Sequence, residues 1–349
     1  MSKKSLKILG AGPAGLAAAI TAAHAGRDVD VYERHNTIGK RFGGDMQGLE
    51  NWSQDIDIIE QLNSMGIKIN FDCDPFDSFI ITDGIKQSTA TFDRPIFYLV
   101  KRGPEKGALD TGLLQQAQDL GVKVHFNTTI ATDAVDIIAS GPQSKEAVAI
   151  AKGIVFKTSA DDCAYALTNE KAAIKGYSYL LITKGYGCMC TVIFDDFKKV
   201  GKCFETTKKI FNDITDIDII EPRDVGGIGN FSSSAPFATG NTTLAGEAAG
   251  LQDFLWGFGM RTAMTSGNLA AKAYIEDFDY KSAAEKEYAD YLKAGVVNRY
   301  IWEKLGNTRY HFLKQKLVKN KKPRIFLKNT FNLSTTQKII YPLAKQSLK

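Results

Sequence analysis

Three glycines near the beginning of the chain, Gly10, Gly12 and Gly15, have the spacing of a turn that binds phosphate groups. In such a turn the first glycine allows a sharp change of direction, the second lets the backbone approach a pyrophosphate, and the third lets a helix pack closely on its strand. Glu33 follows Gly10 at close to the distance of about 20 residues that suits an acid hydrogen-bonded to ribose hydroxyls. Together these residues predict a site for a dinucleotide.

The elements around this turn fit the same prediction. The apolar segment Leu6–Leu9 predicts a buried strand directly before the first glycine. Pro13 suits the first turn of a helix, where its missing N–H has no intrahelical partner, and Gly26 is expected to end that helix. Free N–H groups at the start of the helix would face the phosphates. A second apolar strand, Val29–Tyr32, then leads to Glu33.

A second glycine-rich segment lies far along the chain. A strand delivers an acid, Glu247, into a tight turn after Gly246, and the pair Gly257 and Gly259 precedes a helix that begins near Met260. With this segment the chain resembles the FAD-dependent oxidoreductases of the glutathione-reductase-like superfamily, and within it the geranylgeranyl reductase family. It also resembles the related aromatic-ring monooxygenases.

The resemblance implies that FAD is the cofactor. Glu247 would take the place of the family's Asp, which hydrogen-bonds the ribityl chain, and its extra methylene is a departure that lengthens its reach. Backbone N–H groups of Gly259 and Met260 would stabilise the negative charge of reduced flavin. Ser140 stands where the family turn before Gly141 usually has an acid. The residues implied to bind FAD are Gly10, Gly12, Pro13, Ala14, Gly15, Glu33, Arg34, Arg41, Arg102, Gly141, Gly246, Glu247, Gly257, Gly259 and Met260.

The order of strand and helix signals predicts an α/β fold in which a Rossmann-like FAD-binding domain, of the type the resemblance implies, carries an inserted, mainly antiparallel β-sheet. The FAD-binding domain is expected at 1–70, 101–149 and 237–285, the substrate domain at 71–100 and 150–236, and a basic helical segment at 286–349. Further expected elements are a buried parallel strand at 134–138, strands at 153–158, 177–183 and 188–194, a helix at 204–211, and a glycine-rich segment at 226–229 that closes the region.

Reduction of a carbon–carbon double bond requires a hydride from the flavin and a proton for the other carbon. Candidate proton donors are Tyr177, Tyr179, Lys184 and Asp45, in segments that the family places near the flavin. The residues expected to line the substrate site are Gln47, Trp52, Phe231, Phe254 and Trp256. The rings of Phe231, Phe254 and Trp256 could equally pack helix against sheet, and the segment that contains Gln47 and Trp52 could be a solvated loop.

Three functions follow from these features. The first is a reductase of a prenyl or other apolar unsaturated substrate, served by an external reductant such as NADPH or ferredoxin because a second glycine motif for a nicotinamide is absent. The second is a monooxygenase of an aromatic or polyene substrate. The third is a flavin-binding interaction protein without turnover.

The composition indicates the class of protein, its expected location and the state of its cysteines. The chain has 349 residues, 44% of them hydrophobic, which is typical of a globular protein. The sequence has no run of 18 or more apolar residues, and the expected strand at Leu6–Leu9 leaves no room for a signal peptide before it. A cytoplasmic location is therefore expected. Five cysteines then suggest free thiols, and Cys188 and Cys190 favour packing on a strand over metal binding, so no metal is expected.

Positive charge is concentrated at the end of the chain. The net charge is +5, but from Arg299 onward 13 Lys and Arg face a single acid, Glu303. This block, which also contains Trp302, Tyr310 and Phe331, fits either a helical cap with buried aromatics or a peripheral contact with the anionic inner face of a membrane. Nucleic-acid binding is not expected, because no known motif accompanies the charge.

Overall fold

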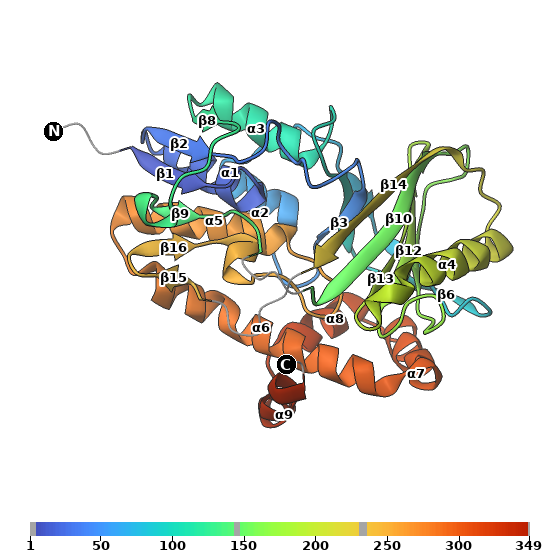
Figure 1. Cartoon of the computed structure of the whole chain (residues 1–349). Coiled ribbons are helices and arrows are strands. Elements are labelled where there is room, and N and C mark those ends of the chain that lie inside the picture. The colour runs from blue at the N-terminus through green and yellow to red at the C-terminus, as the bar shows by residue number, and fades with distance from the viewer. Residues whose placement is uncertain (1–4, 143–146, 230–235, 348–349) are drawn as a thin grey trace.

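The computed structural model describes residues 5–142, 147–229 and 236–347. Two large β-sheets lie side by side, and the C-terminal helices run beneath both of them (Figure 1). The N-terminal part of the chain and the segment before α5 (Met260–Glu276) build one side, while the middle of the chain builds the other.

The first sheet has the strand order β15-β16-β9-β1-β2-β8, and its strands are parallel except for the antiparallel pair β15 and β16. The strand bounds are β1 (Leu6–Leu9), β2 (Val29–Tyr32), β8 (Lys123–His125), β9 (Ile137–Ile138), β15 (Ala238–Thr239) and β16 (Thr242–Leu244). The strand expected at 134–138 is shorter, because a 3₁₀ turn (η1, Thr132–Ala134) precedes β9. Segments far apart in sequence therefore meet at one sheet.

Helices α1 (Pro13–His24), α3 (Leu109–Asp119) and α5 pack with this sheet in one hydrophobic core. Helices α1 and α5 approach each other closely at Gly267, where an added Cβ would lie 2.0 Å from the carbonyl oxygen of Ala14. A side chain at this position would force the two helices apart. The contact fixes the beginning of α1 relative to α5, and both helices begin at the site described below.

The second sheet has the order β14-β10-β13-β12-β11-β5-β6, antiparallel except for β5 and β11. Its strands are β5 (Ser78–Thr82), β6 (Gln87–Thr91), β10 (Ala149–Lys157), β11 (Cys163–Leu167), β12 (Tyr177–Thr183), β13 (Tyr186–Ile193) and β14 (Ile220–Gly229). The glycine-rich segment expected to close this region at 226–229 pairs with β10 as the end of β14.

The two faces of this sheet are buried against different partners. Helix α4 (Val200–Ile214), longer at both ends than expected, covers one face and buries Phe204 and Phe211 against Leu180 and Ile182 of β12. Tyr179 and Leu181 alternate with these residues along the strand and point to the opposite face, as strand geometry requires. That opposite face is turned toward the first sheet and the site.

A small third sheet, in the order β3-β7-β4, connects the two large ones. It is formed by β3 (Met46–Glu50), β4 (Asp74–Phe76) and β7 (Phe97–Lys101), and helix α2 (Ile58–Ser64) follows β3. Two short 3₁₀ segments, η2 (Phe197–Lys199) and η3 (Gly246–Ala249), complete the elements before α5.

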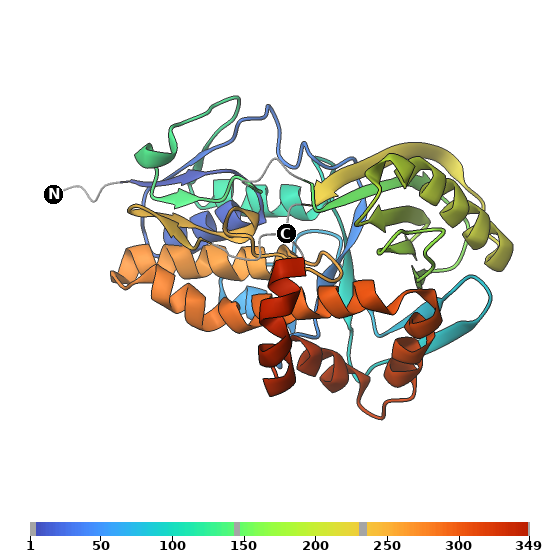
Figure 2. The same ribbon diagram turned by 60° about the horizontal axis from the view of Figure 1, so that its bottom comes forward.

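The end of the chain is helical, as predicted, with α6 (Tyr280–Leu305), α7 (Asn307–Val318), α8 (Pro323–Phe331) and α9 (Thr335–Ser347). Figure 2 shows α6 passing from α5 toward the second sheet, with α7, α8 and α9 gathered around it. Trp302, Tyr310 and Phe331 are buried, and the rings of Trp302 and Tyr310 stack with centroids 4.1 Å apart. Within the described ranges, no helix is both long enough and apolar enough to cross a membrane.

Candidate functional site

A cavity of about 640 Å³, which we call the main cavity, lies between the carboxyl ends of β1, β2 and β9 in the first sheet and one face of the second sheet. Its walls come from segments that are distant in sequence: 10–14, 139–141, 225–229 and 256–260. Both glycine-rich segments that the sequence singled out therefore reach the same space. The first segment leads into the N-terminus of α1, and the second leads into the N-terminus of α5.

The three glycines of the first turn have different surroundings. Gly10 has φ +100°, and an added Cβ would lie 2.5 Å from the carbonyl oxygen of Ala139. A Cβ on Gly15 would lie 1.9 Å from the carbonyl oxygen of Gly10, so packing requires glycine at both positions. At Gly12 a Cβ would meet nothing within 4 Å. Gly12 thus borders open space at the N-terminus of α1, which is the geometry a backbone-bound phosphate requires.

Glu33 comes directly after β2 and lines the main cavity. Its carboxylate accepts hydrogen bonds from the backbone N–H of Ala11, at 3.1 Å, and of His35, at 3.0 Å. These bonds hold the carboxylate beside the glycine turn, where the sequence predicts a ribose. Arg34 also lines the cavity, and its Nε donates to the ring of His35.

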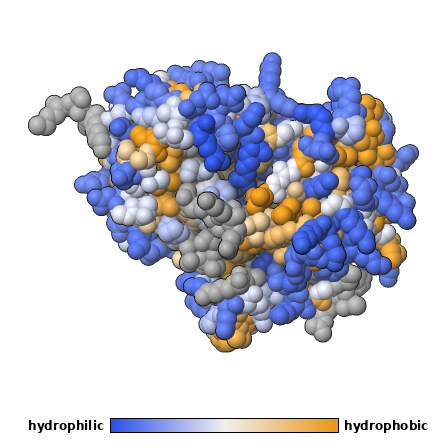
Figure 3. All heavy atoms as spheres, viewed as in Figure 1, coloured by the Kyte–Doolittle hydropathy of each residue, from blue (hydrophilic) through white to orange (hydrophobic). Residues whose placement is uncertain are grey.

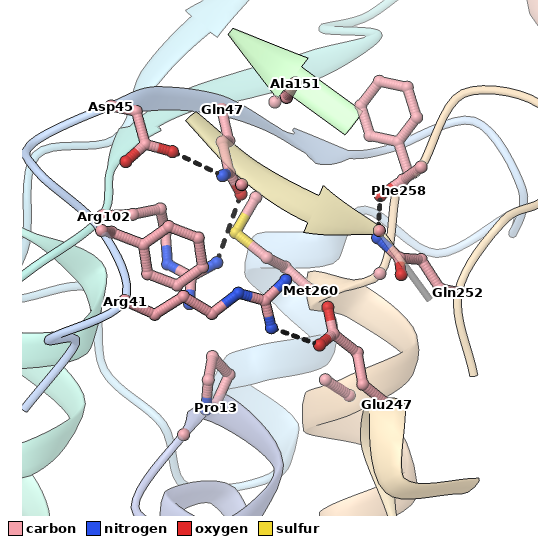
Figure 4. Close-up of a pocket in the computed structure, with 18 of the residues that line it drawn as sticks. Pro13, Arg41, Asp45, Gln47, Arg102, Ala151, Glu247, Gln252, Phe258 and Met260 are labelled. Carbon is pink, nitrogen blue, oxygen red and sulfur yellow. Dashed lines mark hydrogen bonds and ion pairs between the residues drawn. The ribbon is translucent and has the colours of Figure 1, made fainter. Parts of the chain in front are cut away.

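Arg41, Gly141 and Glu247 meet at one point of the cavity. Arg41 Nη1 donates to Glu247 Oε2 at 2.6 Å, and Figure 4 shows this pair lying between Pro13 and Met260. Gly141 has φ +82°, and a Cβ on it would lie 4.0 Å from both partners of the pair. Gly246 is not part of the cavity wall; it has φ +63° and packs against Ala14.

The beginning of α5 and the loop before it also line the main cavity. Gly257 has φ +76°, Gly259 is the N-cap residue and Met260 begins the helix. Asp253, which sequence reasoning missed, fixes this loop because its carboxylate accepts from the backbone N–H of Leu255 and Trp256, at 3.0 and 2.7 Å. Burial raises the pKa of Asp253 to about 7. In the sequence, Asp253 could have been noticed only as an acidic residue within a glycine-rich segment.

Arg102 reaches the cavity but is held by other side chains. Its Nε and Nη2 donate to the two carboxylate oxygens of buried Asp110 at 2.8 and 2.9 Å, and its Nη1 donates to Gln47 at 3.2 Å. Its guanidinium also lies over the ring of Phe42, 4.1 Å from the centroid. Asp110 therefore fixes Arg102 at the cavity wall.

Of the four candidate proton donors, Asp45, Tyr177 and Tyr179 line the main cavity and Lys184 does not. Asp45 lines the main cavity, accepts from Gln47 Nε2 at 2.8 Å, and has its pKa raised by burial (Figure 4). Tyr177 and Tyr179 line the same cavity, and burial raises the pKa of both. The Tyr177 hydroxyl, however, donates to the backbone carbonyl of Trp256.

Lys184 does not lie at the cavity, contrary to expectation. It follows the last residue of β12, with φ +50°, in the turn to β13, and its ammonium pairs with Asp74. The strand leads it away because β12 ends at Thr183, beyond the stretch whose alternate residues face the cavity.

Of the expected substrate residues, Gln47, Trp52 and Trp256 line the main cavity. Phe254 does not: it is 3% exposed and packs against Val296, Val297 and Ala344 in a separate core. Its ring is thus a packing residue, the alternative that the sequence left open. Phe231 lies outside the described residues.

Comparisons with known proteins agree with this architecture. A family model described as an NAD(P)-binding Rossmann-like domain matches residues 8–47. The structure of a geranylgeranyl bacteriochlorophyll reductase-like protein from Thermoplasma acidophilum is similar over 99% of this chain and 98% of that one, with a TM-score of 0.70 and 16% identity. A flavin-dependent brominase gives a TM-score of 0.66 at 15% identity, with 98% of each chain covered. The fold is that of FAD-dependent oxidoreductases. The fold prediction is therefore confirmed.

The same fold occurs in p-nitrophenol 4-monooxygenase from Pseudomonas putida, with a TM-score of 0.61 and 13% identity over 95% of this chain and 99% of that one. A search of curated protein sequences gave no match. At these identities the similarity concerns the fold of the FAD-dependent oxidoreductases, so the reaction must be argued from the cavity itself.

Beyond the glycine segments, the main cavity continues into an apolar lobe, lined by Trp52, Phe79, Phe97, Leu181, Leu317 and Leu327. Trp52 meets Phe258 edge to face, with centroids 4.5 Å apart. Sequence reasoning missed most of this lobe. Leu317 of α7 and Leu327 of α8 belong to the basic tail, and no motif marks them.

The cysteines carry no separate site. All five lie in the described part of the chain and all are free thiols. Cys190 lines the main cavity, and burial raises the pKa of its thiol to about 12, so it stays protonated at neutral pH. Among the described residues no cluster of His, Cys, Asp or Glu has the geometry to hold a metal ion.

Proposed function

We propose that this chain binds FAD along the main cavity and is an FAD-dependent oxidoreductase. The observation that supports this most is the convergence of two helix N-termini, those of α1 and α5, on one cavity. A helix N-terminus favours negative charge, so that of α1 suits a pyrophosphate and that of α5 suits the ring of a reduced flavin. The open space at Gly12 fits the first of these groups.

The acids of the site fit the sugar parts of the same cofactor. Glu33 is held beside the glycine turn by two backbone N–H groups, which leaves its outer face for ribose hydroxyls. Glu247 lies between the two helix N-termini, where a ribityl chain would pass, and its partner Arg41 supplies a cation there. Bound FAD would supply the acceptor and donor of hydride for the reaction.

We further propose that the substrate is a prenyl or other apolar molecule with a carbon–carbon double bond, which the enzyme reduces. The apolar lobe supports this proposal, because its side chains favour hydrocarbon and exclude water from the reacting carbon. The proton would come from Asp45, whose pKa is raised by burial, with Tyr179 as the second donor candidate. Tyr177 is a positioning residue, since its hydroxyl is engaged with Trp256.

The source of electrons would be external. The cavity walls contain the glycine turn at 10–15 and the glycine loop at 257–260, and the proposal uses both for one FAD. The sequence has no second glycine motif for a nicotinamide cofactor, so NADPH would act as a transient reductant or a protein such as ferredoxin would deliver the electrons.

An anaerobic single turnover tests the reaction. The FAD-loaded protein is reduced with dithionite under nitrogen and mixed with prenyl alcohols of increasing length. The molecular mass of the product is then measured by mass spectrometry. Reoxidation of the flavin together with a product heavier by two hydrogens would support the reductase. Leu317→Trp, which fills the lobe, should raise KM for long chains, whereas the exposed Ile339→Trp should not. Failure of every unsaturated substrate to reoxidise the flavin would refute the proposal.

A monooxygenase is the second candidate, because the fold is shared with a p-nitrophenol 4-monooxygenase over nearly the whole length of both chains. The same cavity walls would then accept a flat aromatic substrate. Reduced protein exposed to ¹⁸O₂ with an aromatic or polyene substrate would give a product that carries the label. Absence of product in both experiments, with FAD still bound, would favour the third function, a flavin-binding protein without turnover.

We also propose a peripheral membrane contact through α9. Ile339 is 72% and Leu343 61% exposed, one helical turn apart, and Lys338 adjoins Ile339 in the sequence. Figure 3 shows hydrophobic atoms at the lower edge of the molecule, where Figure 1 places α9. Apolar side chains next to cations suit an anionic membrane surface. The double variant Ile339→Ser, Leu343→Ser should release the protein from phosphatidylglycerol vesicles in a sedimentation assay. Ile85→Ser, at a residue that is 88% exposed in the turn between β5 and β6, should not. Equal binding of all three proteins would refute the contact.

A further inference from the structure

A second cleft, which we call the basic cleft, lies between the beginning of β6 and helix α7. Its volume is about 410 Å³, and no residue of its lining belongs to the main cavity. Residues 86–88 form one wall and α7 the other. Lysines on both walls, Lys86 on one and Lys314 and Lys319 on the other, make it strongly positive.

Lys314 is unusual for a lysine because it is only 6% exposed. Its Nζ donates to the backbone carbonyl of Lys86 at 2.8 Å, which uses one of its three N–H groups. Burial lowers the pKa of Lys314, and the charge of Lys86 lowers it further, while Asp83 opposes both effects. A buried ammonium of this kind is costly unless an opposite charge lies close to it.

The described residues provide no such charge at contact distance. Asp83 is the acid that acts on Lys314, yet it forms no ion pair with it, and its carboxylate accepts from the backbone N–H of Ile85 and Lys86 at 2.9 and 2.8 Å. Lys86 and Lys319 likewise form no ion pair with any acid in the described part of the chain. The cleft therefore holds an excess of positive charge that its own walls do not neutralise.

We propose that the basic cleft binds a phosphate group. A phosphate offers several acceptor oxygens and close to two negative charges, which matches three ammonium groups better than a single carboxylate does. Ser88 and Gln87 add a hydroxyl and an amide donor on the strand side. The phosphate is either free in solution or part of a lipid headgroup, and both sources present the same chemistry to the lysines.

The position of the cleft links it to the main cavity through one helix. Lys314 and Val318 of α7 face the basic cleft, while Leu317 of the same helix lines the apolar lobe. A phosphate held between α7 and β6 would tie this helix to the sheet. Occupancy of the cleft would thereby hold one wall of the lobe in place, without any contact between the phosphate and the lobe.

Calorimetric titration of the FAD-loaded protein with inorganic phosphate tests the site. FAD must be present because the glycine turn at Gly12 would otherwise bind phosphate itself; if FAD does not bind, Gly12→Val is used to close that turn. We expect one binding event, weakened at least tenfold by Lys314→Gln. Lys316→Gln is the matched control, since this lysine is on the same helix but lies over the ring of Phe312, outside the cleft.

A second variant separates binding from folding. If Lys314→Gln lowers the melting temperature, the double variant Lys86→Gln, Lys319→Gln, which changes only exposed side chains, should still weaken phosphate binding tenfold. Phosphatidic acid vesicles form the other arm: binding that this double variant removes, without binding of free phosphate, assigns the site to a lipid headgroup. The proposal is overturned if neither ligand binds, or if Lys316→Gln weakens binding as much as the cleft variants do.

Discussion

Replacing Gly12 by valine should abolish FAD binding and leave the fold intact. Gly12 has φ −74° and ψ −179°, an extended conformation that valine adopts without strain, and its Cβ would meet no heavy atom within 4 Å. The isopropyl group would instead occupy the space beside the N-terminus of α1, where a phosphate accepts backbone N–H groups. Loss of two such bonds, at about 1.5 to 3 kcal/mol each, corresponds to at least about 100-fold weaker binding.

The affinity can be measured by titrating FAD into protein from which the cofactor has been removed. Trp52 and Trp256 line the cavity, so their fluorescence should report binding directly. The melting temperature of the protein without FAD measures the fold separately. Gly201→Val is the matched control, because its Cβ also meets nothing within 4 Å but lies on α4, away from the cavity.

Gly15→Val gives the opposite result if the reasoning is correct. Its Cβ would lie 1.9 Å from a backbone oxygen of Gly10, so this variant should lose stability rather than affinity alone. The reasoning would be refuted by a Gly12→Val protein that binds FAD as tightly as the original chain. It would also be refuted if Gly12→Val melted as early as Gly15→Val.

Three further predictions concern the acids of the site. Glu247→Ala should weaken FAD binding but change the free energy of unfolding by no more than about 1 kcal/mol, because its pair with Arg41 is partly exposed; unchanged affinity would contradict it. Asp110→Ala should cost about 3 to 5 kcal/mol in urea unfolding, because it leaves Arg102 buried without its partner. Because burial raises the pKa of Asp253 to about 7, the unfolded state releases this proton first, and the group destabilises the fold increasingly from about pH 4 to 7. Asp253→Asn should remove roughly 2 to 3 kcal/mol of that loss between about pH 5 and pH 7.5, and an unchanged pH dependence of the free energy of unfolding would contradict it.

The cofactor end of the site could be predicted from the sequence because its determinants are local. The strand before Gly10, the turn and helix α1 follow one another within a few residues. Gly10 and Gly15 are required by close backbone contacts, and Gly12 leaves open space for a phosphate, as the spacing predicts. The same holds for the loop that begins α5. The meeting of Arg41 with Glu247 could not be derived in this way, because it depends on how two distant segments are placed by the first sheet.

The substrate end was harder because its walls have no motif. The apolar lobe combines side chains from the second sheet, the third sheet and the C-terminal helices, and each looks like an ordinary core residue in the sequence. Phe254 shows the reverse error: it stands in a glycine-rich functional segment but packs in a separate core. Lys184 could have been set aside, since the strand period that places Tyr177 and Tyr179 on one face ends just before it.

The basic tail shows why the net charge of a segment does not by itself identify a membrane-binding surface. Arg299 and Lys314 are buried, and Arg324 and Lys328 pair with Asp93 and Asp55. These four cations stabilise the fold or line the basic cleft, so the charge offered to a membrane is smaller than the sequence balance suggests. The membrane proposal therefore depends on the exposed apolar pair of α9 more than on charge, and removing that pair tests it more sharply than raising the salt concentration would.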